Sequence, residues 1–137
     1  MTRFHLLLAC AFVTSGCAAL PHQTMVTSSA SILTPMQLIA TIGAHKGETV
    51  TVAGYFTSVV DTRALWETES AHRNAEQLRK GSWDKCITIY PTSGLARQFN
   101  GHRVHITGNA TIIGKDDFRS SWTCNPVALE NAVITPG

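Results

Sequence analysis

Residues 47–54 read GETVTVAG, and residues 101–108 repeat the pattern as GHRVHITG. Each copy consists of a glycine, two polar residues, Val, a polar residue, Val or Ile, a small or polar residue and a second glycine. Alternating apolar and polar residues are typical of a strand with one buried face. The second glycine falls on the apolar row, where it marks a bulge or a sharp bend. The pattern therefore predicts two long strands, each bent at an inward glycine, Gly54 or Gly108.

A helix is expected before each of these strands. The first helix begins at Thr34-Pro35, because Thr is a good N-cap and Pro is tolerated at the first helical position. Apolar residues then follow with helical spacing until a glycine ends the helix. The second helix is short and spans residues 94–99, with Leu95 and Phe99 facing inward at i, i+4 spacing.

The rest of the chain divides into short apolar stretches separated by turn residues. Strands are expected over residues 48–60, 64–69, 86–90, 102–114 and 129–135, with a polar surface loop and one helical turn over 74–85 and a short strand or loop over 118–123. On the first strand Val50, Val52 and Phe56 should face the core. Tyr55 should face outward.

This order of elements resembles the OB-fold, a five-stranded Greek-key barrel with a helix between its third and fourth strands. Residues 95–108 resemble the passage from that helix into strand four, and residues 47–54 resemble strand one. The likeness implies a mainly β fold, an OB-like barrel in a single domain (residues 32–137) with an added N-terminal helix. The group that the chain resembles is that of small bacterial envelope lipoproteins with an OB-like domain, many of which have no assigned activity.

The N-terminus has the parts of an export signal. Arg3 supplies a positive charge, residues 6–13 form a short apolar run, and small residues lead to Cys17. The run is too short to span a bilayer. The small residues before Cys17 resemble the lipobox of bacterial lipoproteins, with Thr14 where Leu is usual. The resemblance implies a signal peptide over 1–17 and a lipid on Cys17.

The residues after Cys17 bear on where the protein is located. Ala18 differs from the Asp associated with inner-membrane retention, so the resemblance implies an outer-membrane anchor facing the periplasm. Residues 18–31 lack periodicity and charge and predict a flexible tether. The alternative is an ordinary secretory signal cut near Ala18 or Ala19, which would leave a soluble periplasmic or secreted protein.

The four cysteines predict one disulfide. Cys10 leaves with the signal and Cys17 is assigned to lipid, so Cys86 and Cys124 remain in an oxidising compartment. A disulfide between them would close a loop of about 38 residues and contribute roughly 4 kcal/mol in the chain-entropy model. A redox or metal-binding pair is the alternative, but the chain has no C-x-x-C and no His at zinc-ligand spacing from either cysteine.

Five residues form the candidate binding face of the predicted barrel: Tyr55, Trp66, Arg73, Trp83 and Tyr90. The outer face of strands two and three, with its flanking loops, is the surface that OB-folds use for binding. In the alternative interpretation Trp66 and Tyr90 pack inside the barrel. Aromatic and basic residues together also suit single-stranded nucleic acid, but residues 61–86 hold five basic and five acidic side chains.

Two further groups of polar residues have a possible chemistry and a plainer interpretation. Glu67 and Glu69 would share one face of a strand, where a carboxylate pair can act in acid–base chemistry or bind a cation. A solvated strand edge is the plainer interpretation. His102 and His105 fall on opposite faces of a straight strand and do not suit one metal. Arg103 and His105 share the outer face as a small basic patch or as solvated surface.

Composition and motifs favour a binding protein over an enzyme. The 137 residues are 44% hydrophobic and only 15% charged, and the net charge of +2 is too small for sequence-independent nucleic-acid binding. No G-x-S-x-G, Walker-type or H-E-x-x-H motif is present. We expect a lipid-anchored, periplasm-facing protein that binds an envelope protein or a small ligand, without cofactor or metal. The alternatives are a cell-envelope hydrolase and a single-stranded nucleic-acid-binding domain.

Overall fold

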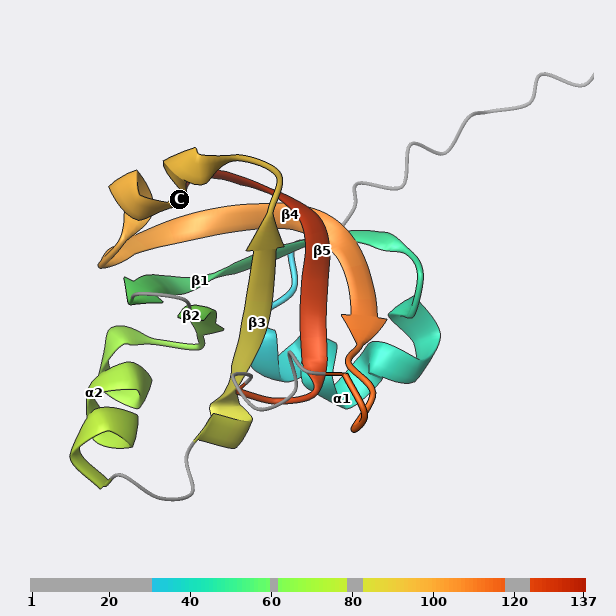
Figure 1. The fold of residues 1–137 in the computed structure, drawn as a ribbon, viewed down its shortest axis with the longest axis horizontal. Coiled ribbons are helices and arrows are strands. Elements are labelled where there is room, and N and C mark those ends of the chain that lie inside the picture. Colours follow the sequence, from blue (N-terminus) through green and yellow to red (C-terminus); the bar gives the residue numbers. More distant parts are fainter. Residues whose placement is uncertain (1–30, 60–61, 79–82, 118–123) are drawn as a thin grey trace, which may run out of the picture.

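Two long strands, β1 (Thr49–Val59) and β4 (His102–Ile112), run antiparallel across the barrel and carry the two copies of the repeated pattern. The computed structural model describes residues 31–59, 62–78, 83–117 and 124–137 (Figure 1). The opening glycine of each copy adopts a positive φ, 85° at Gly47 and 80° at Gly101. Each also donates its N–H to the other long strand, to the carbonyl of Ala110 and of Phe56 respectively. The two copies therefore form one paired unit.

Three shorter strands close the barrel. β2 (Thr62–Trp66) pairs with β1, and β3 (Cys86–Pro91) pairs with β2. β5 (Val127–Pro136) lies parallel to β3 and antiparallel to β4, which gives the closed order β1-β2-β3-β5-β4. The predicted fold class, a mainly β five-stranded barrel with helices, is confirmed. The predicted region 118–123 lies outside the described residues.

The N-terminal helix α1 (Pro35–His45) is also confirmed and lies across one end of the barrel (Figure 1). Thr34 and Gln37 form a reciprocal capping box, in which each side chain accepts the other residue's backbone N–H. Leu38 is fully buried in the barrel core. Among the described residues, no helix is long and apolar enough to cross a membrane.

The segment between β2 and β3 differs from the prediction. β2 ends at Trp66, and residues expected in a strand and a loop form the helix α2 (Glu69–Leu78), followed by the short 3₁₀ helix η1 (Trp83–Lys85). Thr68 caps α2 by accepting the N–H of Ala71 at 3.1 Å. The helix contacts the outside of β2 (Figure 1). Its only buried described side chain is Ala75, and the apolar residues of the segment, Ala71, Ala75 and Leu78, form a narrow stripe at i, i+4, i+7 in an otherwise polar sequence.

The helix between β3 and β4 forms as predicted, but only one of the two residues predicted to face inward does so. The element η2 (Gly94–Phe99) is a 3₁₀ helix, in which residues three apart share a face. Ala96 and Phe99 therefore pack on the core, whereas Leu95 is 66% exposed. The last strand also starts earlier than expected, at Val127.

Gly54 and Gly108 are buried where the barrel leaves no room for a side chain. A Cβ built on Gly54 would lie 2.5 Å from the Trp66 carbonyl oxygen and 2.9 Å from Leu65 Cγ. A Cβ on Gly108 would lie 2.9 Å from the carbonyl oxygen of Glu130. Real Cβ atoms do not approach backbone this closely, so both strands depend on glycine at these points. The predicted inward glycines are confirmed.

Replacing either glycine should unfold the barrel in part or in full. We expect Gly54→Ala to cost about 3 kcal/mol or more, since backbone of β2 must shift, and Gly108→Ala to cost about 1–3 kcal/mol. The matched control is Gly43→Ala in α1, where nothing lies within 4 Å of the new Cβ. That change should be neutral or stabilise by up to about 1 kcal/mol. Urea unfolding measures all three, and equal stability of Gly54→Ala and Gly43→Ala would contradict the steric account.

Candidate functional site

The outer face of β1 and β2 carries an aromatic cluster that α2 covers. Leu65 points into the core, so its neighbour Trp66 points outward, and yet Trp66 is only 1% exposed. Its Nε1 donates to Thr57 Oγ1 at 3.0 Å in a buried hydrogen bond. Trp66 therefore lies neither inside the barrel nor free on its surface. The interpretation that places Trp66 inside the barrel is wrong, because it packs with Ala64, Ala75 and Cys86 in a separate buried group. Its place on a binding face stays a prediction.

His72 of α2 is the residue that joins the helix to this face. Its ring centroid lies 5.1 Å from that of Trp66, in an edge-on arrangement, and 5.9 Å from that of Tyr55. The ring centroid of Trp83 lies 5.5 Å from that of Trp66. His72 Nε2 also lies 3.2 Å from Glu76 Oε1 within the helix. We refer to Tyr55, Trp66, His72 and Trp83 as the aromatic cluster.

The predicted disulfide Cys86–Cys124 is confirmed and supports the same region. Cys86 is fully buried and pairs with Trp66 across β2 and β3. With Ala64, Trp66 and Ala75 it forms a small buried group separate from the barrel core. The bridge closes a loop of 38 residues that contains all of β3 and β4, which corresponds to about 4 kcal/mol in the chain-entropy model. It joins the start of β3 to the chain just before β5.

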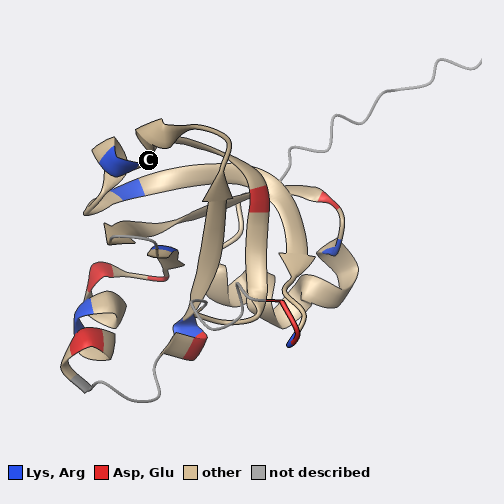
Figure 2. Ribbon diagram, in the orientation of Figure 1, with Lys and Arg blue, Asp and Glu red and all other residues tan. Residues whose placement is uncertain are grey.

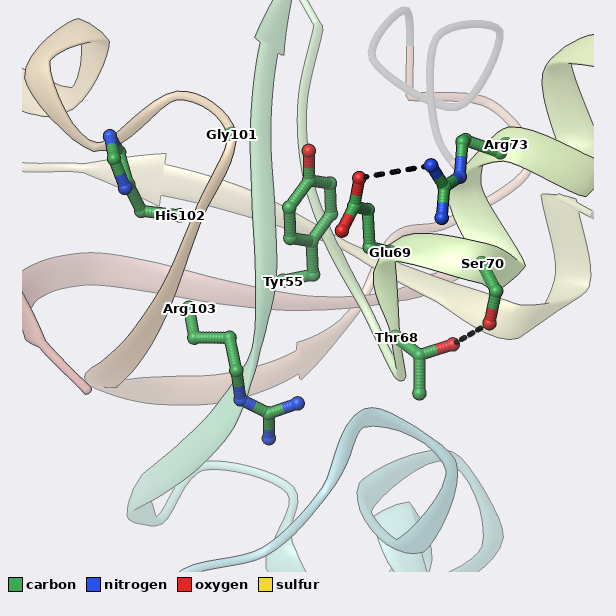
Figure 3. Close-up of a pocket in the computed structure, with 8 residues that line it drawn as sticks. All are labelled: Tyr55, Thr68, Glu69, Ser70, Arg73, Gly101, His102 and Arg103. Carbon is green, nitrogen blue, oxygen red and sulfur yellow. Dashed lines mark hydrogen bonds and ion pairs between the residues drawn. The ribbon is translucent and has the colours of Figure 1, made fainter.

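An open groove of about 440 Å³ lies where β1, the start of α2 and the start of β4 meet (Figure 3). Its described lining is polar and consists of Tyr55, Thr68, Glu69, Ser70, Arg73, Gly101, His102 and Arg103. We call it the α2 groove. Tyr55 and Arg103 are direct partners in the β1–β4 ladder, so two rigid strands hold these side chains next to each other.

The charges of the α2 groove are unequal. Arg73 Nη1 lies 3.4 Å from Glu69 Oε1, an exposed i, i+4 pair of the kind worth about 0–1 kcal/mol. Among the described residues, no carboxylate lies within ion-pair distance of Arg103. Figure 2 shows the basic start of β4 and the mixed charges of α2. The hydroxyls of Thr68 and Ser70 are hydrogen-bonded to each other at 2.9 Å. The groove can therefore offer an uncompensated guanidinium and several hydroxyls to a ligand.

A second, smaller hollow of about 180 Å³ lies on the other side of His72. Its described lining includes Trp66, Trp83, His72 and Glu76, with Val59 at its edge. The wall that Trp66 contributes is almost wholly covered, so most of the accessible aromatic surface belongs to Trp83, which is 42% exposed. The aromatic cluster thus separates a polar groove from an apolar hollow.

The structure brings together four of the five residues predicted for the binding face. Tyr55, Trp66 and Trp83 belong to the aromatic cluster, and Arg73 lines the α2 groove. Tyr90 lies farther along β3 and lines neither hollow. The predicted binding face did not include three further residues that the structure places here: His72, His102 and Arg103. An i, i+4 pattern after Thr68, Glu69 with Arg73 and His72 with Glu76, is the signal that could have indicated α2.

The proposed carboxylate pair does not form. Glu67 Oε2 accepts the N–H of Met36 at 3.2 Å, at the start of α1, whereas Glu69 lies in α2 and pairs with Arg73. Since β2 ends before both residues, they do not share a strand face. His102 lines the α2 groove and His105 pairs with Ala53 and Thr135 in the sheet. The described part of the chain contains no group of three or more His, Cys, Asp or Glu side chains able to hold a metal ion.

Comparison of the chain with protein-family models, with curated proteins and with solved structures finds no match. The function therefore has to be argued from the geometry of this face.

Removing the Thr57 hydroxyl should destabilise the buried Trp66 on which α2 packs. Thr57→Val keeps the shape of the side chain but leaves the buried Nε1–H of Trp66 without an acceptor, so we expect a loss of about 1–3 kcal/mol. The matched control is Thr107→Val, because the hydroxyl pair of Thr107 and Thr51 is exposed and water can replace it. Its effect should stay within about 0.5 kcal/mol. Urea unfolding followed by tryptophan fluorescence makes the comparison, and equal losses for the two variants would contradict this role of Thr57.

Proposed function

We propose that this protein is a non-catalytic binding protein of the bacterial cell envelope, anchored by a lipid on Cys17. Its ligand, an envelope protein or a small molecule, contacts the outer face of the barrel around α2. The observation that carries the proposal is the α2 groove, where polar side chains from three separate segments of the chain converge. Ligand sites combine concavity and aromatic surface with a few convergent polar groups that fix the ligand's orientation, and the α2 groove offers Tyr55 together with such polar groups.

The stability of the groove walls supports a binding role. Tyr55 and Arg103 are held by strand pairing, and α2 contacts the same face of the barrel through His72 and Trp66. A wall that is fixed before the ligand arrives, as the β1–β4 wall is, reduces the entropy lost on binding. The groove volume of about 440 Å³ lies within the range of small-molecule and peptide sites.

The chemistry of the lining favours binding over hydrolysis. Glu69 is the only carboxylate among the described lining residues, and it is already paired with Arg73. Thr68 and Ser70 share a hydrogen bond with each other and not with a histidine or carboxylate that could activate them. The arrangement suits recognition of a ligand.

The location in the envelope is supported by two independent features. The leader ends at a lipobox-like Cys17, which lies outside the described residues along with most of the tether. The disulfide Cys86–Cys124 is of a kind that persists in oxidising compartments such as the periplasm. Both features favour an exported domain, and the lipobox-like Cys17 favours its attachment to a membrane.

Photocrosslinking in intact cells tests the proposal. A photoreactive benzoylphenylalanine in place of Ser70, which is exposed on the groove, should form an adduct with the ligand, and intact mass measurement distinguishes a protein from a small molecule. The matched control replaces Val133, which is exposed on β5 and does not line the groove. Adducts at both positions in equal yield, or at neither, would contradict a binding role for this face.

Separating membranes from the soluble periplasmic fraction of the same cells tests whether a lipid on Cys17 anchors the protein. The wild-type chain should sediment with membranes, and Cys17→Ser should appear in the soluble periplasmic fraction. A Cys17→Ser variant that still sediments with membranes would contradict lipid anchoring. The Cys10→Ser variant is the control, since that residue leaves with the signal peptide and its replacement should change nothing.

A further inference from the structure

The α2 groove holds one more positive charge than negative charge among its described residues. Arg73 and Arg103 contribute two guanidinium groups, and Glu69 contributes one carboxylate. Arg73 already shares its charge with Glu69 at 3.4 Å. Arg103 remains without a carboxylate within ion-pair distance in the part of the chain that the structure describes. A ligand that balances this charge carries a single negative charge.

From this we infer that the α2 groove recognises a carboxylate on a polar ligand, with Arg103 as the residue that binds it. The inference rests on the proposed binding function and names the class of ligand. A guanidinium presents a planar fork of N–H donors that matches the two oxygens of a carboxylate. A dianion such as a phosphate monoester fits less well, because Glu69 lines the same groove and repels the second charge.

The position of Arg103 favours a specific contact over general attraction. Strand pairing sets it opposite Tyr55, and Figure 3 shows the Tyr55 ring between the start of β4 and the Glu69–Arg73 pair. Strand positions are held more rigidly than loop positions, so the backbone of Arg103 and that of Tyr55 stay in a fixed relation. Arg103 and Tyr55 therefore project from one wall of the groove and can donate to different parts of one ligand.

Gly101 keeps the Tyr55 hydroxyl open to the groove. A Cβ at this position would lie 3.7 Å from Tyr55 Oη, and a longer side chain would extend over it. The hydroxyls of Tyr55, Thr68 and Ser70 can then contact the polar body of the ligand, while Arg103 binds its carboxylate. Two sources supply such a group, the free carboxyl end of a peptide and the acid group of a sugar. The test separates them.

Isothermal titration calorimetry of the full chain, purified from envelopes in mild detergent, makes the test with matched probes. The peptide pair is N-acetyl-alanyl-alanine and its C-terminal amide, and the sugar pair is glucuronate and glucuronamide. At least one acid should bind, and its amide should bind at least about tenfold more weakly, because a charge-assisted hydrogen bond is lost. Equal binding of an acid and its amide would overturn the inference, as would inorganic phosphate binding more tightly than either acid.

Variants then assign the contact to its residue. Arg103→Gln should weaken binding of the acid by about tenfold or more, and Arg103→Lys should restore part of the loss. Glu69→Gln should tighten binding by about two- to fivefold, since it frees Arg73 from its surface ion pair. Lys46→Gln, which removes a charge at the far end of α1, should leave the affinity unchanged. Unchanged affinity in Arg103→Gln would overturn the assignment.

The two proposals fail in different ways. Groove adducts in intact cells, combined with no binding of either acid, would retain the binding function and reject the carboxylate. Absence of adducts at the Ser70 position, together with no binding of either acid, would reject both.

Discussion

The pairing of β1 with β4 is the constraint on which the rest of the structure depends. The two copies of one pattern run antiparallel, from Thr49 opposite Asn109 to Phe56 opposite His102, so that Gly108 faces Val50 and Gly54 faces Val104. Each closing glycine meets backbone of another strand, β2 for Gly54 and β5 for Gly108. The same register sets Tyr55 opposite Arg103, and the wall of the α2 groove follows directly from the pairing that closes the barrel.

The helix α2 decides which part of the outer face a ligand can reach. Because it covers Trp66 and contacts Tyr55 through His72, it converts an aromatic strand face into a buried support. Accessible polar groups then lie at the start of the helix, next to β4, and not over β2 and β3. A helix of mostly polar residues can stay there because Ala75, Trp66 and the buried Cys86 pack together beneath it. The proposed binding site and the packing of α2 thus depend on the same aromatic cluster.

Alternation and capping residues were sufficient to predict most of the barrel. They indicated both long strands, the inward positions of Gly54 and Gly108, the capped start of α1 and, with the cysteine count, the bridge Cys86–Cys124. They missed α2, because residues 69–78 are mostly polar and their helical apolar stripe consists only of Ala71, Ala75 and Leu78. The groove could not be predicted without that helix. Arg103 was recognised only as an outward basic residue, since its neighbours Thr68 and Arg73 come from α2 and the turn before it.

Hydrogen exchange of the backbone amides shows whether the β1–β4 pairing is the most stable part of the fold. If β1–β4 pairing holds the fold together, the amides hydrogen-bonded between these strands should exchange most slowly, with a free energy of opening equal to that of global unfolding in denaturant. Amides of α2 should exchange faster, through local opening of a helix held by few contacts. Exchange of the β1–β4 amides at free energies well below global unfolding, or faster than that of α2, would contradict the account.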